Sequence, residues 1–256
     1  MTRDRRHLHL ARERFLAGLG VPQPRPFAPD EFQLTAIQSL LDGYDTLVIA
    51  PTGTGKTYIA TEAIRGIIEL GKRAIYTAPL KALSNAKYAE MKKLFEPKFR
   101  VGLLTGDRKI EGDANVVVAT TEIYRNELYS YSENYALVVL DEFHYLADQQ
   151  RGPVWEESVV LSPSSSTLLM LSASISNPEE IARWIEQVRN KPVRIISVRD
   201  RPVELRLGFL HLELGVLPLE DADGSIFPEV AQFYTNGFSR GRSFDRGRGK
   251  FRRTRG

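Results

Sequence analysis

Short runs of hydrophobic residues recur along the middle of this chain. They occupy residues 46–50, 74–78, 101–105, 115–119, 135–140, 167–172 and 193–198. Segments with helix-like spacing of apolar residues lie between several of these runs, at 57–70, 80–95, 121–131 and 179–189. Continuous apolar runs are typical of strands buried on both faces. The alternation therefore predicts an α/β fold, with a mostly parallel sheet and helices on both faces.

The two ends of the chain follow other patterns. Basic and apolar residues alternate over 1–20, which favours a short helix, and the four prolines of Val21–Pro29 indicate an extended connector. Leu205–Leu219 has β character, and residues 221–224 read as a turn. From Gly237 onward the chain is rich in Arg, Gly and Ser, a composition typical of disorder. We expect a leader and connector at 1–26, the α/β body at 27–205, an inter-domain segment beginning at 206–236 and a tail at 237–256.

Composition narrows the class of protein. The 256 residues are 42% hydrophobic, enough for one sizeable α/β domain with tails. Cysteine is absent, which excludes disulfides and thiolate metal sites, and the four histidines lack the spacing of zinc ligands. We find neither a secretory leader nor an apolar run long enough to span a bilayer, so the sequence predicts a cytoplasmic protein without a membrane partner.

The charge is unevenly distributed. The formal net charge is +3, but residues 238–256 alone carry +7 and the rest of the chain −4. The tail has arginines with phenylalanines between them, which can bind single-stranded nucleic acid through charge and stacking. The same tail is also compatible with a solvated linker whose charge is incidental.

A glycine-rich segment, APTGTGKT, lies at Ala50–Thr57 between a predicted strand and a predicted helix. Backbone amides in such a loop, together with the helix N-terminus, can surround a triphosphate. Lys56 can reach the β and γ phosphates, and the Thr57 hydroxyl can ligate Mg²⁺. Ala50 stands where the general pattern begins with glycine. The predicted nucleotide-binding residues of the loop are Pro51, Thr52, Gly53, Thr54, Gly55, Lys56 and Thr57.

A pair of carboxylates follows the apolar run 135–140. Asp141 and Glu142 begin the segment DEFH, at the strand end where parallel sheets place ligands. Asp141 is expected to hold Mg²⁺, and Glu142 to orient and deprotonate the attacking water. The predicted catalytic set is Lys56, Asp141 and Glu142.

Four further motifs lie where strands end. They are TAPLKAL at Thr77–Leu83, TGD at Thr105–Asp107, TTE at Thr120–Glu122 and SAS at Ser172–Ser174. Pro79 suits a first helical turn, and Lys81 with exposed amides could hold a nucleic-acid phosphate. TTE would close a strand and cap the next helix. Each motif is also compatible with an ordinary strand end.

As an ordered set, APTGTGKT, TAPLKAL, TGD, TTE, DEFH and SAS resembles the first RecA-like domain of superfamily 2 helicases. DEFH makes it a DExH variant. The segments DQQRGPVWEE (Asp148–Glu157) and TTEIYRNEL (Thr120–Leu128) resemble the Ski-like branch. The resemblance covers roughly residues 27–205 and implies a RecA-like fold, ATP and Mg²⁺ as cofactors, and ATP-driven movement along a nucleic-acid strand.

The resemblance also implies roles for particular residues. Gln33 would read the edge of the adenine and Phe27 would stack on it, although Phe27 could equally be a core residue. His144, Ser172 and Ser174 would couple the nucleotide site to a neighbouring surface. The implied nucleic-acid contacts are Pro79, Leu80, Lys81, Thr105, Gly106, Asp107, Thr120, Thr121 and Glu122.

Helicases of this family have a second RecA-like lobe that completes the ATP cleft. The sequence has no second strand–helix series, so we expect a fragment or single domain of a longer enzyme, nearly inactive alone. The expected partners are single-stranded nucleic acid, with RNA favoured over DNA, and the second lobe, in a monomer. Two alternatives are a non-catalytic nucleic-acid-binding module that uses nucleotide as a switch, and an ATPase that moves something other than nucleic acid.

Overall fold

A computed structural model describes residues 4–17, 19, 28–130, 135–199, 205–211, 215–221 and 223–237. The chain divides into two compact units, Pro26–Val203 and a second unit formed by Met1–Arg25 with Glu204–Gly256. The first unit contains all the motifs singled out above.

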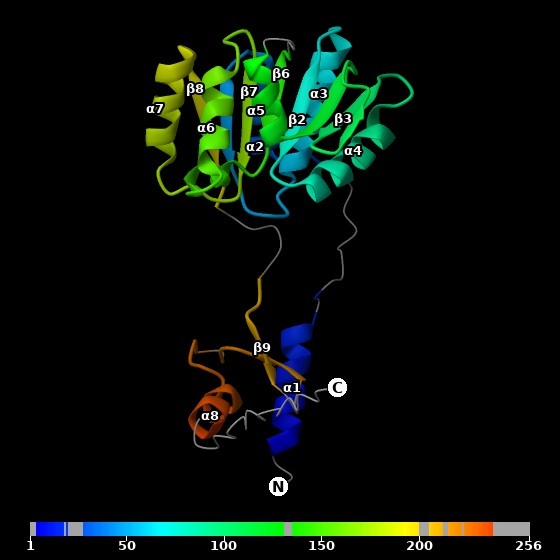
Figure 1. Cartoon of the computed structure of the whole chain (residues 1–256). Coiled ribbons are helices and arrows are strands. Elements are labelled where there is room, and N and C mark those ends of the chain that lie inside the picture. Colours follow the sequence, from blue (N-terminus) through cyan, green and yellow to red (C-terminus); the bar gives the residue numbers. More distant parts are fainter. Residues whose placement is uncertain are drawn as a thin grey trace, which may run out of the picture. The chain divides into compact units, whose positions relative to one another are not determined.

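One eight-stranded sheet forms the centre of the first unit (Figure 1). Its spatial order is β4-β3-β5-β2-β6-β7-β1-β8, and every pair is parallel except the antiparallel pair of β3 and β4. The strands are β1 Asp45–Ile49, β2 Ala74–Ala78, β3 Val101–Thr105, β4 Arg108–Ile110, β5 Val116–Thr120, β6 Leu137–Leu140, β7 Thr167–Ser172 and β8 Val193–Ser197. The mostly parallel α/β fold predicted from the apolar runs is confirmed.

Helices cover both faces of this sheet. Alternate strand residues point to opposite faces, so Val48 belongs to the core that contains residues of α2, α3 and α4, whereas Leu47 belongs to the core that contains residues of α5, α6 and α7. The first group of helices is α2 Glu31–Leu41, α3 Lys56–Glu69 and α4 Lys81–Phe95. The second group is α5 Thr121–Tyr129, the 3₁₀ turn η1 Phe143–Ala147, α6 Gly152–Leu161 and α7 Pro178–Arg189.

Each predicted strand and helix of the body is present within a few residues of its expected bounds. The helices α2 and α6 and the short strand β4 were not predicted. The sequence of α6 begins with Gly-Pro, which is typical of a turn. It ends with a short apolar run, which is typical of a strand. β4 has three residues, too few for an alternating pattern.

A buried ion pair joins the amino-terminal end of the sheet to the end of α7. Arg189 Nε donates to Asp45 Oδ2 at 2.6 Å, and both side chains are shielded from solvent. Arg189 also donates to the carbonyl of Ser162 at 2.7 Å and that of Ser166 at 2.8 Å. The main-chain amide of Leu168 donates to Asp45 Oδ1 at 2.8 Å. Because its polar atoms are extensively paired, the network can be buried between β1, β7 and α7 without unmatched charge.

The second unit has its own small core. It comprises α1 Asp4–Leu16, an antiparallel hairpin of β9 Gly208–His211 and β10 Gly215–Pro218, and α8 Pro228–Gly237. Leu217, Phe227 and Val230 are buried there, with Leu8 and Phe209 packed against them. The helix expected within 1–20 and the β character of 205–219 are confirmed, and α8 was not predicted. Residues 238–256, expected to be disordered, lie outside the described residues.

None of the helices that the structure describes is both long enough and apolar enough to cross a membrane.

Candidate nucleotide site and nucleic-acid surface

The glycine-rich loop joins the end of β1 to the start of α3, as expected. Gly53 and Gly55 have φ angles of 86° and 79°, a region that side-chain-bearing residues rarely adopt. The Thr54 hydroxyl closes the turn by donating to the carbonyl of Pro51 at 2.8 Å. The amides in the first turn of a helix have no partner further along the helix, so a loop that leads into the start of α3 has the geometry of an anion site.

Lys56 turns its side chain back into the loop. Its Nζ donates to the carbonyl oxygens of Ala50 at 2.6 Å and Pro51 at 3.0 Å. Burial lowers the pKa of Lys56, and the carboxylates of Glu142 and Asp141 partly offset this by raising it. The ammonium group therefore lies near both the loop and the acidic pair, where it can neutralise bound phosphate.

Gln33 is a buried residue of α2 that supports the loop. Its Nε2 donates to the carbonyl of Thr54 at 3.0 Å, and its Oε1 accepts from the amide of Asp30 at 2.9 Å. A Cβ on Gly55 would lie 2.5 Å from Nε2, so the glycine is needed for this contact. Both ends of the Gln33 amide are thus engaged within the protein. Its reading of an adenine stays a prediction, and Phe27 lies outside the described residues.

The acidic pair follows β6. The amide of Asp141 donates to the carbonyl of Thr77 at 3.1 Å, and Asp141 Oδ2 accepts a short hydrogen bond from the Tyr76 hydroxyl. Burial, followed by the charge of Asp141, raises the pKa of Tyr76 well above its ordinary value, so the phenol remains a donor. Asp141 is therefore held in place from β2.

Glu142 has a left-handed backbone, with a φ of 52°. Such conformations cost energy in residues with a side chain and are common at functional sites. Its Oε2 lies 3.3 Å from His144 Nδ1, and both side chains are partly exposed. Glu142 can therefore reach solvent near the loop, as a group that orients water must.

The oxygen atoms of Thr57 and Asp141 suit a hard divalent cation. Mg²⁺ prefers one or two protein oxygens together with water and phosphate. Thr57 lies on the first turn of α3, and its Oγ1 accepts a 3.0 Å hydrogen bond from Lys87 Nζ. The residues present fit Mg²⁺ with a nucleotide phosphate.

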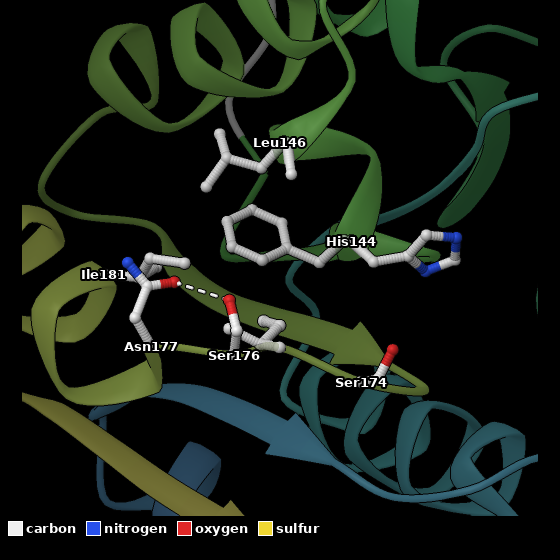
Figure 2. Close-up of a pocket in the computed structure, with 9 residues that line it drawn as sticks. His144, Leu146, Ser174, Ser176, Asn177 and Ile181 are labelled. Atoms are coloured by element: carbon white, nitrogen blue, oxygen red, sulfur yellow. Dashed lines mark hydrogen bonds between the residues drawn. The ribbon is translucent and has the colours of Figure 1, made fainter.

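Ser172 lies between the loop and the acidic pair, because β7 separates β1 from β6. The amide of Ala50 donates to the carbonyl of Ser172 at 3.0 Å, and the Ser172 hydroxyl donates to the carbonyl of Ser174 at 3.0 Å. Ser174 and His144 line one pocket of ≈ 420 Å³. In Figure 2 the His144 ring extends away from Leu146 and Ile181. Three residues expected to couple the sites are thus adjacent to the loop or the acidic pair.

The remaining motifs lie at the carboxyl ends of three other strands of the same sheet. β3, β5 and β2 are neighbours and end at Thr105, Thr120 and Ala78. Lys81 Nζ lies 3.2 Å from Asp107 Oδ1, which also accepts from the Thr105 hydroxyl at 2.9 Å. The hydrogen bonds from Thr105 and Lys81 lower the pKa of Asp107. TGD and TAPLKAL therefore form one connected surface.

The expected nucleic-acid contacts differ in exposure. Leu80, Lys81, Gly106 and Asp107 are exposed and Glu122 is half-buried, whereas Pro79, Thr105, Thr120 and Thr121 are buried. The expected place of Pro79 in the first helical turn was wrong, because α4 begins at Lys81 and its N-cap is Leu80. Thr120 ends β5 and is the N-cap of α5, as expected, but its hydroxyl makes no capping hydrogen bond. The buried residues therefore offer little side-chain surface for contact with nucleic acid.

The two Ski-like segments pack against each other, a relationship that sequence reasoning missed. Arg125 of α5 donates to Glu157 of α6 at 2.6 Å, and Tyr129 donates to the same carboxylate at 3.1 Å. The hydroxyls of Tyr124 and Ser162 lie 2.6 Å apart. Opposite charges at Arg125 and Glu157 were a visible signal, but nothing local indicated that they meet.

The sequence profile of the DEAD/DEAH box helicase family matches residues 30–181. This chain therefore belongs to that family of helicases.

Among characterised relatives, the chain is 43% identical over 208 residues to the probable helicase HelY of Mycobacterium leprae, covering 78% of this chain and 22% of that protein. It is 44% identical over 207 residues to the chloroplastic DExH-box ATP-dependent RNA helicase DExH15 of Arabidopsis thaliana, covering 77% and 17%. It is 39% identical over 193 residues to the antiviral helicase SKI2 of Saccharomyces cerevisiae, covering 73% and 15%. The resemblance to the Ski-like branch is confirmed, and the chain spans less than a quarter of these relatives.

The fold also matches that of the DUF1998 helicase MrfA in a crystal structure with bound DNA. The TM-score is 0.56 at 21% identity, covering 73% of this chain and 29% of that one. At this identity the match concerns the fold, and it confirms the RecA-like class.

Proposed function

We propose that this chain is the ATP-binding first motor lobe of an ATP-dependent helicase, which couples ATP hydrolysis to movement along a strand when joined to a second RecA-like lobe. The observation that carries the proposal is the position of two motifs on one sheet edge. The loop after β1 and the acidic pair after β6 are separated by β7 alone. Parallel α/β sheets bind ligands at this edge.

The residues of the site have distinct proposed roles. The amides of the loop and the ammonium of Lys56 bind the phosphates, and the oxygens of Thr57 and Asp141 hold Mg²⁺. ATP supplies the phosphoryl group, and Mg²⁺ neutralises charge that develops on it. Glu142 orients the attacking water and accepts its proton.

The nucleic-acid surface is proposed at the ends of β2, β3 and β5. Lys81 supplies a cation and Gly106 an exposed main chain, which suits contact with phosphate rather than with bases. RNA is favoured over DNA because relatives at 41–44% identity are named RNA helicases. Monomeric state and cytoplasmic location stay predictions.

The described residues form one RecA-like sheet, so they supply one side of an ATP cleft. Cationic groups that complete such clefts in other NTPases raise the rate by roughly 10³–10⁵. We therefore expect this chain alone to bind Mg·ADP weakly and to hydrolyse ATP very slowly.

Calorimetry with Mg·ADP and a phosphate-release assay test the proposal. Binding with little turnover supports it. Turnover equal to that of a two-lobe helicase would contradict the need for a second lobe, and the absence of nucleotide binding would contradict the assignment of the site.

A further inference from the structure

Lys87 of α4 contacts the proposed Mg²⁺ ligand Thr57. Its Nζ donates to Thr57 Oγ1 at 3.0 Å and to Glu90 Oε2 at 2.9 Å. The side chain is 21% exposed, and its ammonium lies 5.9 Å from the centre of the Tyr76 ring. Sequence reasoning assigned Lys87 no role, because it lies within the helix after TAPLKAL.

Both proposed Mg²⁺ ligands are thus held by the strand and helix that flank the loop Pro79–Leu80. Tyr76 of β2 donates to Asp141, and Lys87 of α4 donates to Thr57. A hydroxyl oxygen that ligates Mg²⁺ lies about 2.1 Å from the metal. An ammonium group 3.0 Å from the same oxygen would be close to a divalent cation, and the two charges would repel each other.

We propose that Lys87 is a positioning residue that takes the place of Mg²⁺ at Thr57 when the metal is absent, so that Lys87 and Mg²⁺ compete for this hydroxyl. Glu90 retains the ammonium group once Thr57 turns to the metal. The inference rests on the proposed nucleotide site and adds a residue to it.

A competition differs measurably from two simpler roles. If Lys87 only attracts phosphate by its charge, its removal weakens nucleotide binding equally with and without Mg²⁺. If Lys87 only stabilises the fold, its removal again changes the affinity for nucleotide equally with and without Mg²⁺. Competition instead changes the ratio of the two affinities, because the lysine assists binding without metal and opposes binding with metal.

The test is a fluorescence titration with a labelled ADP, once in Mg²⁺ and once in EDTA. The measured quantity is the Mg²⁺ advantage, Kd in EDTA divided by Kd in Mg²⁺. Hydrogen bonds with an ionised partner are strong enough that Lys87→Met should raise this advantage on the order of tenfold. Lys93→Met, an exposed lysine of the same helix, should leave it unchanged.

A second variant, at a residue outside the buried core, should favour Lys87 over Mg²⁺ at the Thr57 hydroxyl. Glu90→Gln weakens the alternative partner of Lys87, so the ammonium stays longer at Thr57 and the Mg²⁺ advantage should fall several-fold. An unchanged advantage in both Lys87→Met and Glu90→Gln would overturn the inference while leaving the nucleotide site intact. No ADP binding by the unmodified chain would overturn the proposed function, and this inference with it.

Discussion

The main-chain amide of Ala50 donates a 3.0 Å hydrogen bond to the carbonyl oxygen of Ser172. This bond extends the pairing of β1 with β7 by one residue, into the glycine-rich loop. The loop therefore begins at a backbone position set by the end of β7. The SAS segment is in this way joined to the loop by its backbone and to the pocket beside His144 by Ser174.

Glu142→Gln should separate binding from chemistry. The amide keeps the size of the side chain but cannot accept a proton at neutral pH, so hydrolysis should fall roughly 10²–10⁴-fold in the proposed two-lobe enzyme. The affinity for Mg·ADP should change less than about twofold, since the proposed phosphate contacts are retained. Glu179→Gln on the exposed start of α7 is the control. Near-normal phosphate release by Glu142→Gln would show that another group is the base.

Asp107→Asn should strengthen binding of a single strand. The exposed carboxylate pairs with Lys81 at 3.2 Å and competes with phosphate for that cation. Because exposed ion pairs contribute about 0–1 kcal/mol, the gain should be at most roughly fivefold. Asp113→Asn removes another exposed carboxylate, which pairs with Arg100, and it serves as the control in an anisotropy titration. Equal effects of both variants would assign the gain to net charge and contradict a role for Lys81.

Asp45→Ala should destabilise the fold strongly. It leaves the buried guanidinium of Arg189 without its carboxylate, and breaking such a pair typically costs about 3–5 kcal/mol. Asp42→Ala, at an exposed carboxylate 4.0 Å from Arg194, should cost less than about 0.5 kcal/mol. Urea unfolding followed by circular dichroism measures both. A loss below about 1 kcal/mol for Asp45→Ala would mean that Arg189 finds a substitute partner.

Deletion of residues 238–256 should flatten the salt dependence of single-strand binding. The segment has seven Arg and one Lys. For single strands, the logarithm of the affinity falls with the logarithm of the salt concentration, with a slope of about −0.7 for each phosphate that the protein neutralises. Affinity should fall with little dependence on base sequence, while nucleotide affinity stays constant. A salt titration of the full chain against one ending at Gly237 measures the slopes. Identical slopes would identify the tail as a linker.

The fold was predictable because its signals are local. Apolar runs such as 135–140 indicate buried strands by themselves, and the glycines at 53 and 55 mark a turn whose position between strand and helix shows in the sequence. The rule that parallel sheets bind ligands at their carboxyl edge then places Lys56 and Asp141 on the same side.

What could not be predicted depends on contacts between distant segments. The pairing of Asp45 with Arg189 requires α7 to end beside β1, and no local pattern marks either residue. Lys87 reaches Thr57 because α4 lies next to α3, and the helical spacing of 80–95 does not show this. Thr121 is likewise buried in the fold, although a threonine at a helix start is usually exposed to solvent.

Calorimetric titration of Mg·ATP into the chain and into its Lys56→Ala variant tests whether Ala50–Thr57 binds the nucleotide. Lys72→Ala, an exposed lysine beyond the end of α3, is the matched control. We expect measurable Mg²⁺-dependent binding by the unmodified chain and by Lys72→Ala. Lys56→Ala should lose affinity on the order of tenfold or more, because the proposed phosphate cation is gone. Equal affinity of Lys56→Ala and the unmodified chain would contradict the assignment of Ala50–Thr57 as the nucleotide site.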